Sequence, residues 1–332
     1  MRNEKAEAEF LFAPLEGITF PVFRKVHYEM FPGAAEYYSP FLAPDSEGSF
    51  KPSFLREKLP DSELGIPLVP QLLANDPNAF LITAKKLRDL GYDEINLNAG
   101  CPSGTVFAKY KGSGMLRDLK TFENFLDNVF NGAESLQIRI SVKTRLGVQS
   151  TDEFPEILKI YNKYPISKLI IHARDRNGMY QSVPDISRFA SALKDSRSPV
   201  CYNGEIFTPK DFDDLWQSVP EVNSVMVGRG AVANPALVRM LRGGNALEKE
   251  ELFEFHNRLF DESISRGLSP IFAVQRMKEI WFYMIWMFPG SEKYYKAIKK
   301  ARMPEDYRSA VNSLFRNAGF DGNLGFPGTR KG

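Results

Sequence analysis

The sequence predicts an α/β protein in which a (β/α)8 TIM barrel is followed by a small C-terminal helical domain. Short apolar segments recur about every 30 residues up to Gly243, and helical patterns separate them. Apolar segments that alternate with helices favour a parallel sheet buried on both faces. After Gly244 no strand-like segment follows. We therefore place a barrel domain at 1–243 and a helical domain at 244–332.

Eight segments are predicted to form the barrel strands. They are 10–13, 36–39, 67–72, 93–98, 138–144, 168–172, 200–203 and 222–227. Eight strand–helix units match the count of a TIM barrel. A doubly wound open sheet is the alternative, but it leaves the even spacing and the count of eight unexplained.

Capping signals and apolar periodicity predict the helices. Asp76-Pro77 begins a helix that Gly91 ends, and Thr208-Pro209 begins another that ends near Ser218. In the helical domain we expect helices over 252–260, 280–288 and 307–315, with the aromatic residues of 281–286 in the core. The tail from Gly322 is rich in glycine and proline, which favours disorder.

Composition argues against several function classes. A net charge of +2 creates no overall field for nucleic acid or membrane, so any basic surface must be local. Cys101 and Cys201 lie far apart in the sequence and the chain has three histidines, so the usual spacing of metal ligands is missing and we expect no metal site. The charged start 1–5 is unlike a signal peptide, and the longest apolar run, 280–288, is shorter than the ~20 residues that span a bilayer. We expect a cytoplasmic monomer without a membrane partner.

Chemically distinctive residues fall at the predicted strand ends, where TIM barrels carry their active sites. Cys101 follows the strand 93–98, and Pro102 can continue neither a strand nor a helix, so the thiol is presented on a loop. Cys201, inside an apolar strand, is expected to be a buried hydrophobic residue. The other strand-end residues are Pro14, Leu15, Glu16, Gln71, Asn98, Lys143, Arg145, His172, Arg174, Asn203, Gly204, Glu205, Gly228 and Arg229.

The last two strand ends predict a phosphate site. In TIM barrels a phosphate commonly lies between the loops after strands seven and eight, where Gly204, Gly228 and Gly230 let backbone N–H groups approach and Arg229 adds charge. Because the third glycine of a dinucleotide fingerprint is missing, FMN fits better than a dinucleotide. Lys143 would then stabilise the reduced flavin, and the Cys101 thiol, protonated at neutral pH, would be the acid.

Seven motifs resemble those of the tRNA-dihydrouridine synthase family, in the same order over about residues 10–240. They are Ala13-Pro14-Leu15-Glu16-Gly17, Asn98-Ala99-Gly100-Cys101-Pro102-Ser103, Gly112-Ser113-Gly114-Met115-Leu116, Lys143-Thr144-Arg145, His172-Ala173-Arg174, Asn203-Gly204-Glu205 and Gly228-Arg229-Gly230. The helical tail resembles the family's RNA-recognition domain more loosely.

The resemblance implies a TIM barrel with tightly bound FMN, which NADPH reduces, and reduction of the C5–C6 bond of particular uridines in tRNA. Cys101 would protonate C5 while hydride goes to C6. Residues implied to line the flavin are Pro14, Leu15, Glu16, Gln71, Lys143 and His172. Residues implied to hold its ribityl phosphate are Asn203, Gly204, Glu205, Gly228 and Arg229. Asn98, Arg145 and Tyr180 would face the substrate base, which must leave its stack to reach the pocket.

The helical domain carries the local basic surface. Five basic residues and no acidic one lie between Lys293 and Arg302, and Lys293, Lys296 and Lys300 share one helical face. Phosphate contacts of this kind position RNA without selecting its sequence. A solvated helix face is the alternative interpretation.

Two other functions stay open. One is an FMN-dependent barrel that reduces a small molecule, of the dihydroorotate or enoate type, which would not need the basic helix. The other is an RNA-binding barrel that has lost catalysis, which would not need Cys101, Lys143 and His172. The sequence does not name the target uridine.

Overall fold

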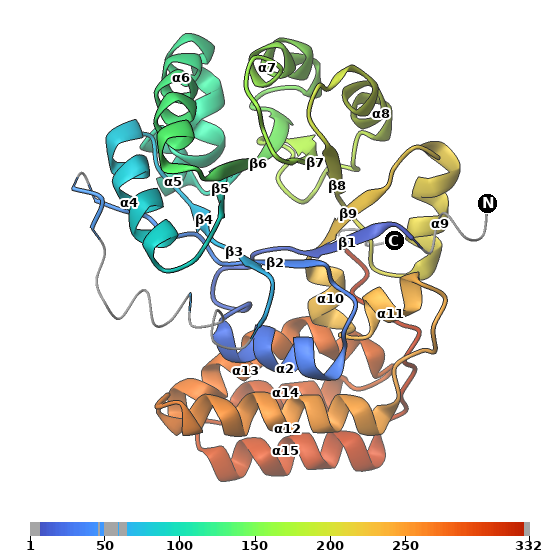
Figure 1. The fold of residues 1–332 in the computed structure, drawn as a ribbon. Helices are drawn as coiled ribbons and strands as arrows, with labels where there is room; N and C mark the ends of the chain where they lie inside the picture. Colours follow the sequence, from blue (N-terminus) through green and yellow to red (C-terminus); the bar gives the residue numbers. More distant parts are fainter. Residues whose placement is uncertain (1–6, 46, 50–58, 60–64, 329–332) are drawn as a thin grey trace.

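The computed structural model describes residues 7–45, 47–49, 59 and 65–328. The predicted barrel is confirmed, because nine parallel strand segments form one sheet in the order β3-β2-β1-β9-β8-β7-β6-β5-β4 (Figure 1). The segments are β1 (Glu9–Phe12), β2 (Glu36–Tyr38), β3 (Leu68–Val69), β4 (Gln71–Leu72), β5 (Glu94–Ala99), β6 (Arg139–Gly147), β7 (Leu169–Asp175), β8 (Val200–Asn203) and β9 (Ser224–Val227).

Nine segments correspond to the eight predicted strands because Pro70 divides the third one. Proline has no N–H to donate, so the ladder is interrupted at this residue. The half before it, β3, pairs with β2, and the half after it, β4, pairs with β5. The Pro70 carbonyl still accepts a hydrogen bond from the Asn96 amide at 2.8 Å. The ring of strands therefore closes through residues 68–72.

Helices follow the strands, as the capping signals predict. Asp76 accepts a hydrogen bond from the Asn78 amide at the start of α4, and Thr208 forms a capping box with Asp211 at the start of α9. The barrel helices are α2 (Pro21–Met30), α4 (Pro77–Asp89), α5 (Gly104–Ala108), α6 (Leu119–Leu136), α7 (Phe154–Tyr161), α8 (Ile186–Asp195), α9 (Pro209–Ser218), α10 (Arg229–Ala233) and α11 (Leu237–Leu241). Two short 3-10 helices, η2 (Gly112–Arg117) and η3 (Thr151–Glu153), lie in the loops.

Four helices and a 3-10 turn form the C-terminal region, which packs on one side of the barrel (Figure 1). They are α12 (Lys249–Ser265), α13 (Pro270–Met284), η4 (Ile285–Met287), α14 (Glu292–Lys300) and α15 (Pro304–Asn317). Helix α12 packs on α2, and α13 packs on α10. At its centre the Tyr307 hydroxyl is hydrogen-bonded to His256 at 2.7 Å and to Trp281 at 2.9 Å. The core position predicted for Trp281 is confirmed, whereas Phe282 and Trp286 lie at the surface, 50% and 45% exposed.

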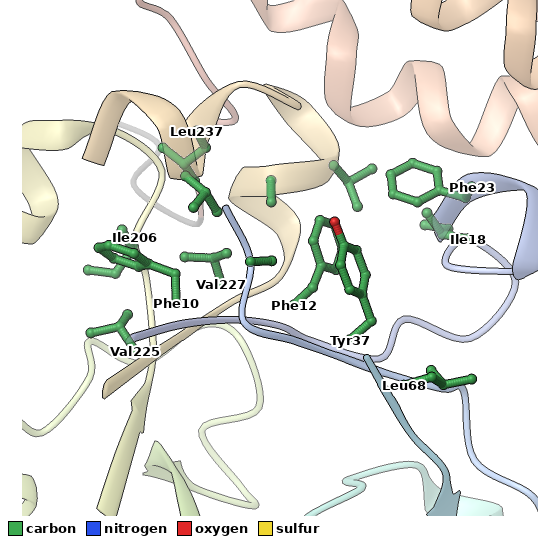
Figure 2. Close-up of a cluster of buried hydrophobic side chains, with 14 of the residues drawn as sticks. Phe10, Phe12, Ile18, Phe23, Tyr37, Leu68, Ile206, Val225, Val227 and Leu237 are labelled. Carbon is green, nitrogen blue, oxygen red and sulfur yellow. The ribbon is translucent and has the colours of Figure 1, made fainter. Parts of the chain in front are cut away.

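Strand β1 separates two apolar clusters because its side chains alternate between faces. Phe10 and Phe12 point outward and pack among the strands and the helices that cover them, as Figure 2 shows. Leu11 and Ala13 point into the barrel, where Cys201 joins them. Cys201 is fully buried, so the prediction of a small hydrophobic residue at this position is confirmed.

The chain after α15 returns to the barrel (Figure 1). Asn234 donates hydrogen bonds to the carbonyls of Gly322 and Leu324, and Phe326 lies 5.7 Å from the Phe207 ring. Residues 322–328, whose composition favours disorder, thus contact the barrel, while 329–332 and the charged start 1–5 lie outside the described residues. Within the described part, no helix is long and apolar enough to cross a bilayer.

Candidate active site

Two adjoining cavities open at the carboxyl ends of the strands. The wide cavity has a volume of about 280 Å³, and the narrow cavity has a volume of about 80 Å³. Residues that line both cavities are Pro14, Leu15, Lys143, His172 and Tyr180. The wide cavity is further lined by Glu16, Ile18, Pro40, Phe41, Gln71, Asn98, Gly100, Cys101, Pro102, Arg145 and Tyr283. The narrow cavity is further lined by Ala13, Asn203, Gly204, Phe207, Gly228 and Arg229. Most of the predicted strand-end residues thus share one cleft.

A chain of amide side chains positions Cys101. The Asn98 Oδ1 atom accepts hydrogen bonds from the Gly100 amide at 3.1 Å and from the Cys101 amide at 2.9 Å. Its Nδ2 atom donates to Gln71 at 2.8 Å, and Gln71 donates to Asn96 at 2.7 Å. All three amide side chains are buried, so the turn before Cys101 is fixed from inside the barrel.

The segment after α5 holds the Cys101 loop from its other side. The Ser113 amide and hydroxyl both donate to the Cys101 carbonyl, at 3.1 and 2.8 Å. Gly112 has φ +58°, and a Cβ there would lie 2.8 Å from the Cys101 Cβ. A Cβ on Gly114 would lie 2.6 Å from the Phe107 carbonyl oxygen. Gly112 therefore serves close packing against the Cys101 loop as well as a turn, and Gly114 serves close packing against α5.

The electrostatics keep the thiol protonated and the lysine charged at neutral pH. Burial raises the pKa of Cys101, although Arg145 and Lys143 partly oppose the shift. Burial and the positive charge of Arg145 lower the pKa of Lys143 to about 8. The Lys143 Nζ atom donates to Asn203 at 2.7 Å, and Lys143 lines both cavities.

Arg145 joins two loops of the cleft. Its Nε atom donates to the Gly100 carbonyl at 2.9 Å, and its Nη1 atom donates to the carbonyls of Asp175 and Met179 at 2.8 and 3.1 Å. Its Cζ atom also lies 5.7 Å from the Tyr180 ring centroid. Burial lowers the pKa of Arg145 to about 10, so it stays charged. This residue faces the wide cavity while it ties the Cys101 loop to the loop that carries Tyr180.

His172 is a neutral imidazole. Burial and four surrounding cations hold its pKa well below the ordinary value for histidine. Arg174, fully buried beside it, donates to the Ser182 carbonyl at 2.6 Å and forms an ion pair with Glu205 at 2.8 Å. A neutral ring of this kind can donate or accept a hydrogen bond to a ligand without adding charge.

The narrow cavity is cationic on one wall. The Arg229 guanidinium stacks 4.4 Å from the Tyr180 ring centroid and forms an ion pair with Glu205 at 3.5 Å. Glu205 itself lines neither cavity, because its carboxylate lies between Arg229 and Arg174. Gly204 is required for packing, since a Cβ there would lie 2.0 Å from the Tyr202 hydroxyl oxygen.

The predicted basic helix face is exposed on α14 but does not line either cavity. Lys293, Lys296 and Lys300 are all exposed. The neighbouring Lys299 lies closer to the site, because it borders a groove of about 500 Å³ that shares Glu16, Ile18 and Tyr283 with the wide cavity.

Sequence reasoning missed several residues of the cleft. Pro40 and Phe41 follow a predicted strand, so their position at a strand end was an available signal. Tyr283 comes from α13, and no local pattern indicates that this helix docks at the barrel opening. Among the described residues, no cluster of three or more His, Cys, Asp or Glu side chains could hold a metal ion.

Comparison with known proteins identifies the family. The model of the family "Dihydrouridine synthase (Dus)" matches residues 11–317. The chain belongs to the dihydrouridine synthase family. A probable tRNA-dihydrouridine synthase of Staphylococcus aureus is 30% identical over 286 residues, which cover 82% of this chain and 83% of that protein. The probable tRNA-dihydrouridine synthase 2 of Bacillus subtilis is 26% identical over 327 residues, covering 92% and 94%.

Membership of the dihydrouridine synthase family agrees with the geometry of the cleft. Six of the seven motifs that carried the resemblance contribute residues to the two cavities, and the seventh, at 112–116, packs on the Cys101 loop; all seven lie within the matched range. The protein is therefore an oxidoreductase with a TIM-barrel catalytic scaffold.

Proposed function

We propose that this protein reduces the C5–C6 bond of specific uridines in tRNA to 5,6-dihydrouridine, with bound FMN as cofactor and NADPH as reductant. The observation that carries the proposal is a thiol kept protonated by burial in the same cavity as Lys143 and a neutral His172. The names of the relatives, probable tRNA-dihydrouridine synthases, support tRNA as the substrate.

The residues present suit FMN. Pro14 and Leu15 provide an apolar wall for a planar ring along both cavities, and Lys143 provides a cation for its pyrimidine edge. Gly228 and Arg229 line the narrow cavity, where a phosphate would find a backbone approach and a guanidinium. The chemistry that a reduced flavin supplies when bound is hydride transfer to C6 of the uracil ring.

Residues of the chain perform the remaining steps. Cys101 gives its proton to C5, so that the hydride at C6 and the proton at C5 together saturate the double bond. Asn98 fixes the loop on which the thiol stands. Arg145 and Tyr180 border the space for the base, and His172 offers a neutral hydrogen-bond partner to the flavin.

The two domains have different functions in this proposal. Residues 1–243 hold the cofactor and the acid, and residues 244–332 recognise the RNA. A uridine stacked in folded RNA cannot enter the cleft, so it must turn out of its stack. The lysines of α14, at positions 293, 296 and 300, would bind phosphates, and Tyr283 of α13 would meet the base at the cavity mouth.

The test is the dihydrouridine content of tRNA, measured by mass spectrometry in cells with and without this gene. We expect a site-specific loss of dihydrouridine that the parental gene restores. Cys101→Ala should retain the yellow flavin spectrum, but its turnover should fall by a factor of about 10²–10⁴, which is the usual contribution of a general acid. Parental turnover in Cys101→Ala would refute the acid assignment. Unchanged tRNA, with a yellow protein, would refute the substrate assignment and favour a small-molecule substrate.

A further inference from the structure

A cluster of cations next to the Cys101 loop has no part in the proposed chemistry. The Arg117 Cζ atom lies 4.9 Å from the ring centroid of Phe107 and 4.5 Å from that of Tyr110. The Arg176 Cζ atom lies 4.2 Å from the Phe107 centroid. Two lysines of the same segment complete this arginine–aromatic rim, which consists of Phe107, Lys109, Tyr110, Lys111, Arg117 and Arg176.

Close ion pairs do not fix the cations of the rim, although the charge of the Asp76 carboxylate acts on Lys111. Among the described residues, none of its four cations forms an ion pair with an acidic side chain within 4 Å. The Arg176 Nε atom is buried without a hydrogen-bond acceptor, and its Nη1 atom reaches only Asn177, at 3.2 Å. Two guanidinium groups that share one aromatic ring repel each other, and an unsatisfied buried N–H is costly. An anionic ligand would relieve both costs.

The aromatic rings prepare the guanidinium groups for such a ligand. Stacking holds each planar group in one orientation, so less side-chain entropy is lost when an anion binds. Guanidinium groups bind phosphate oxygens through paired hydrogen bonds. The rim therefore fits phosphate groups better than isolated surface lysines do.

The rim is attached to the loop that carries the acid. The Phe107 amide donates to the Ser103 carbonyl at 2.8 Å, and the Ser113 amide, between the rim's lysines and Arg117, donates to the Cys101 carbonyl. Arg176 follows Asp175, whose carbonyl accepts from Arg145. A phosphate on the rim would therefore lie beside the Cys101 loop, which itself lines the wide cavity.

The rim and the groove beside α14 lie next to strand ends on opposite sides of the barrel. Lys299 and Tyr295 of α14 share a groove with Glu16 and Ile18, which follow β1. The rim residues of α5 and η2 lie between β5 and β6 in the chain, and β6 is four places from β1 around the ring of eight strands. A polyanion that crosses the mouth of the cavity can touch both surfaces.

We propose that the arginine–aromatic rim binds the RNA phosphate backbone on the side of the pocket opposite α14, with Arg117 and Arg176 each holding a phosphate. This inference rests on the proposed function, since it assumes an RNA substrate whose uridine enters the wide cavity. The phosphates of the nicotinamide reductant share this chemistry, so the test separates the two sources.

The test uses the flavin-loaded protein with Arg117→Gln and Arg176→Gln combined. Binding to an in vitro transcribed tRNA is measured over a range of salt concentrations, and flavin reduction by NADPH is measured anaerobically. Each phosphate contact contributes about 0.7–0.9 to the slope of log K against log salt, so the loss of two contacts should lower the slope by about 1.4–1.8. The combined Arg→Lys variant should keep most of the slope, because the charge remains. NADPH-driven flavin reduction should stay at the parental rate.

A matched control is the pair Lys194→Gln and Arg197→Gln, which removes two exposed cations at the carboxyl end of α8. This control should leave the slope unchanged. If the combined Arg→Gln variant does not fold, each single variant should lower the slope by about 0.7–0.9.

Three results would overturn the proposal. An unchanged salt slope in the rim variants would show that the rim does not bind RNA. If the parental protein still formed dihydrouridine, the proposed function would stand without the rim. A raised KM for NADPH with an unchanged RNA slope would assign the rim to the reductant. A parental protein that neither binds tRNA nor forms dihydrouridine would defeat both the function and the rim.

Discussion

Gly112 offers a direct test of how the Cys101 loop is held. Its φ of +58° is in the left-handed region, and an alanine Cβ there would lie 2.8 Å from the Cys101 Cβ and 2.9 Å from the Cys101 carbonyl oxygen. The left-handed conformation alone costs an alanine about 1–2 kcal/mol. The collision adds a second effect, because neighbouring atoms of the loop must move before the methyl group can fit.

We expect Gly112→Ala to displace the thiol and to lower the single-turnover rate constant of dihydrouridine formation about 10²-fold, the typical effect of an error of about 1 Å in a reacting group. Flavin content and NADPH-driven flavin reduction should not change, since neither depends on Cys101. The assay is single-turnover reduction of tRNA uridines by the prereduced enzyme.

The matched control is Gly243→Ala. Gly243 has φ +83°, and a Cβ there would meet no atom within 4 Å. It should therefore show a similar loss of stability without a loss of turnover. Parental turnover in Gly112→Ala, or equal losses of turnover in both variants, would refute the reasoning that close packing at Gly112 positions the thiol.

The charges of the cleft give two further predictions. Burial lowers the pKa of Lys143 to about 8, so we expect kcat/KM to fall as the pH rises through about 8 and the cation is lost. Lys143→Arg should stay active to higher pH. If the pH profiles of the two proteins coincided, the fall would belong to another group. Glu205→Gln removes the carboxylate shared by two guanidinium groups and should lower the free energy of unfolding in urea by about 3–5 kcal/mol. The exposed Glu221→Gln should change it by less than about 0.5 kcal/mol, and equal stabilities of these two variants would contradict the role of the buried pair.

Local signals predict much of the fold because they act over a few residues. Proline and glycine mark the helix starts and strand ends, and apolar segments mark the strands that are buried on both faces. The division of the third strand at Pro70 also had a local signal, since proline within a central strand interrupts its ladder. The strand-end motifs could be placed in one cleft because all eight strands are parallel.

In the helical domain, local sequence patterns predict which aromatic side chains are exposed but not which one reaches the active-site cleft. The exposure of Phe282 could have been inferred, because the buried residues of α13 repeat at helical spacing and leave this position on the other side, and the exposed Trp286 follows four residues later in η4. The buried positions are Ala273, Val274, Met277, Ile280, Trp281 and Met284. The place of Tyr283 in the wide cavity could not be inferred, since it depends on how α13 docks against α10.

The direction of a charged side chain is decided by partners that are distant in sequence. Glu205 follows a strand end, and its motif predicts a place at the phosphate site, yet a carboxylate near a phosphate would repel it. In the fold it lies between two arginines, where it holds their guanidinium groups and lowers the net positive charge of that wall. This arrangement forms only because the fold brings Arg174 of β7, Glu205 after β8 and Arg229 after β9 together. The sequence motif therefore identifies Glu205 but does not determine what its carboxylate contacts.

Arg145 shows how the two proposals depend on each other. Its guanidinium binds the carbonyl before Cys101 and two carbonyls of the loop that carries Arg176 and Tyr180. A ligand that orders the rim through Arg176 therefore also restrains the loop of the acid, through contacts that do not involve the reacting base. Binding energy from remote phosphates can in this way be used to fix the thiol against C5 instead of merely tightening the complex.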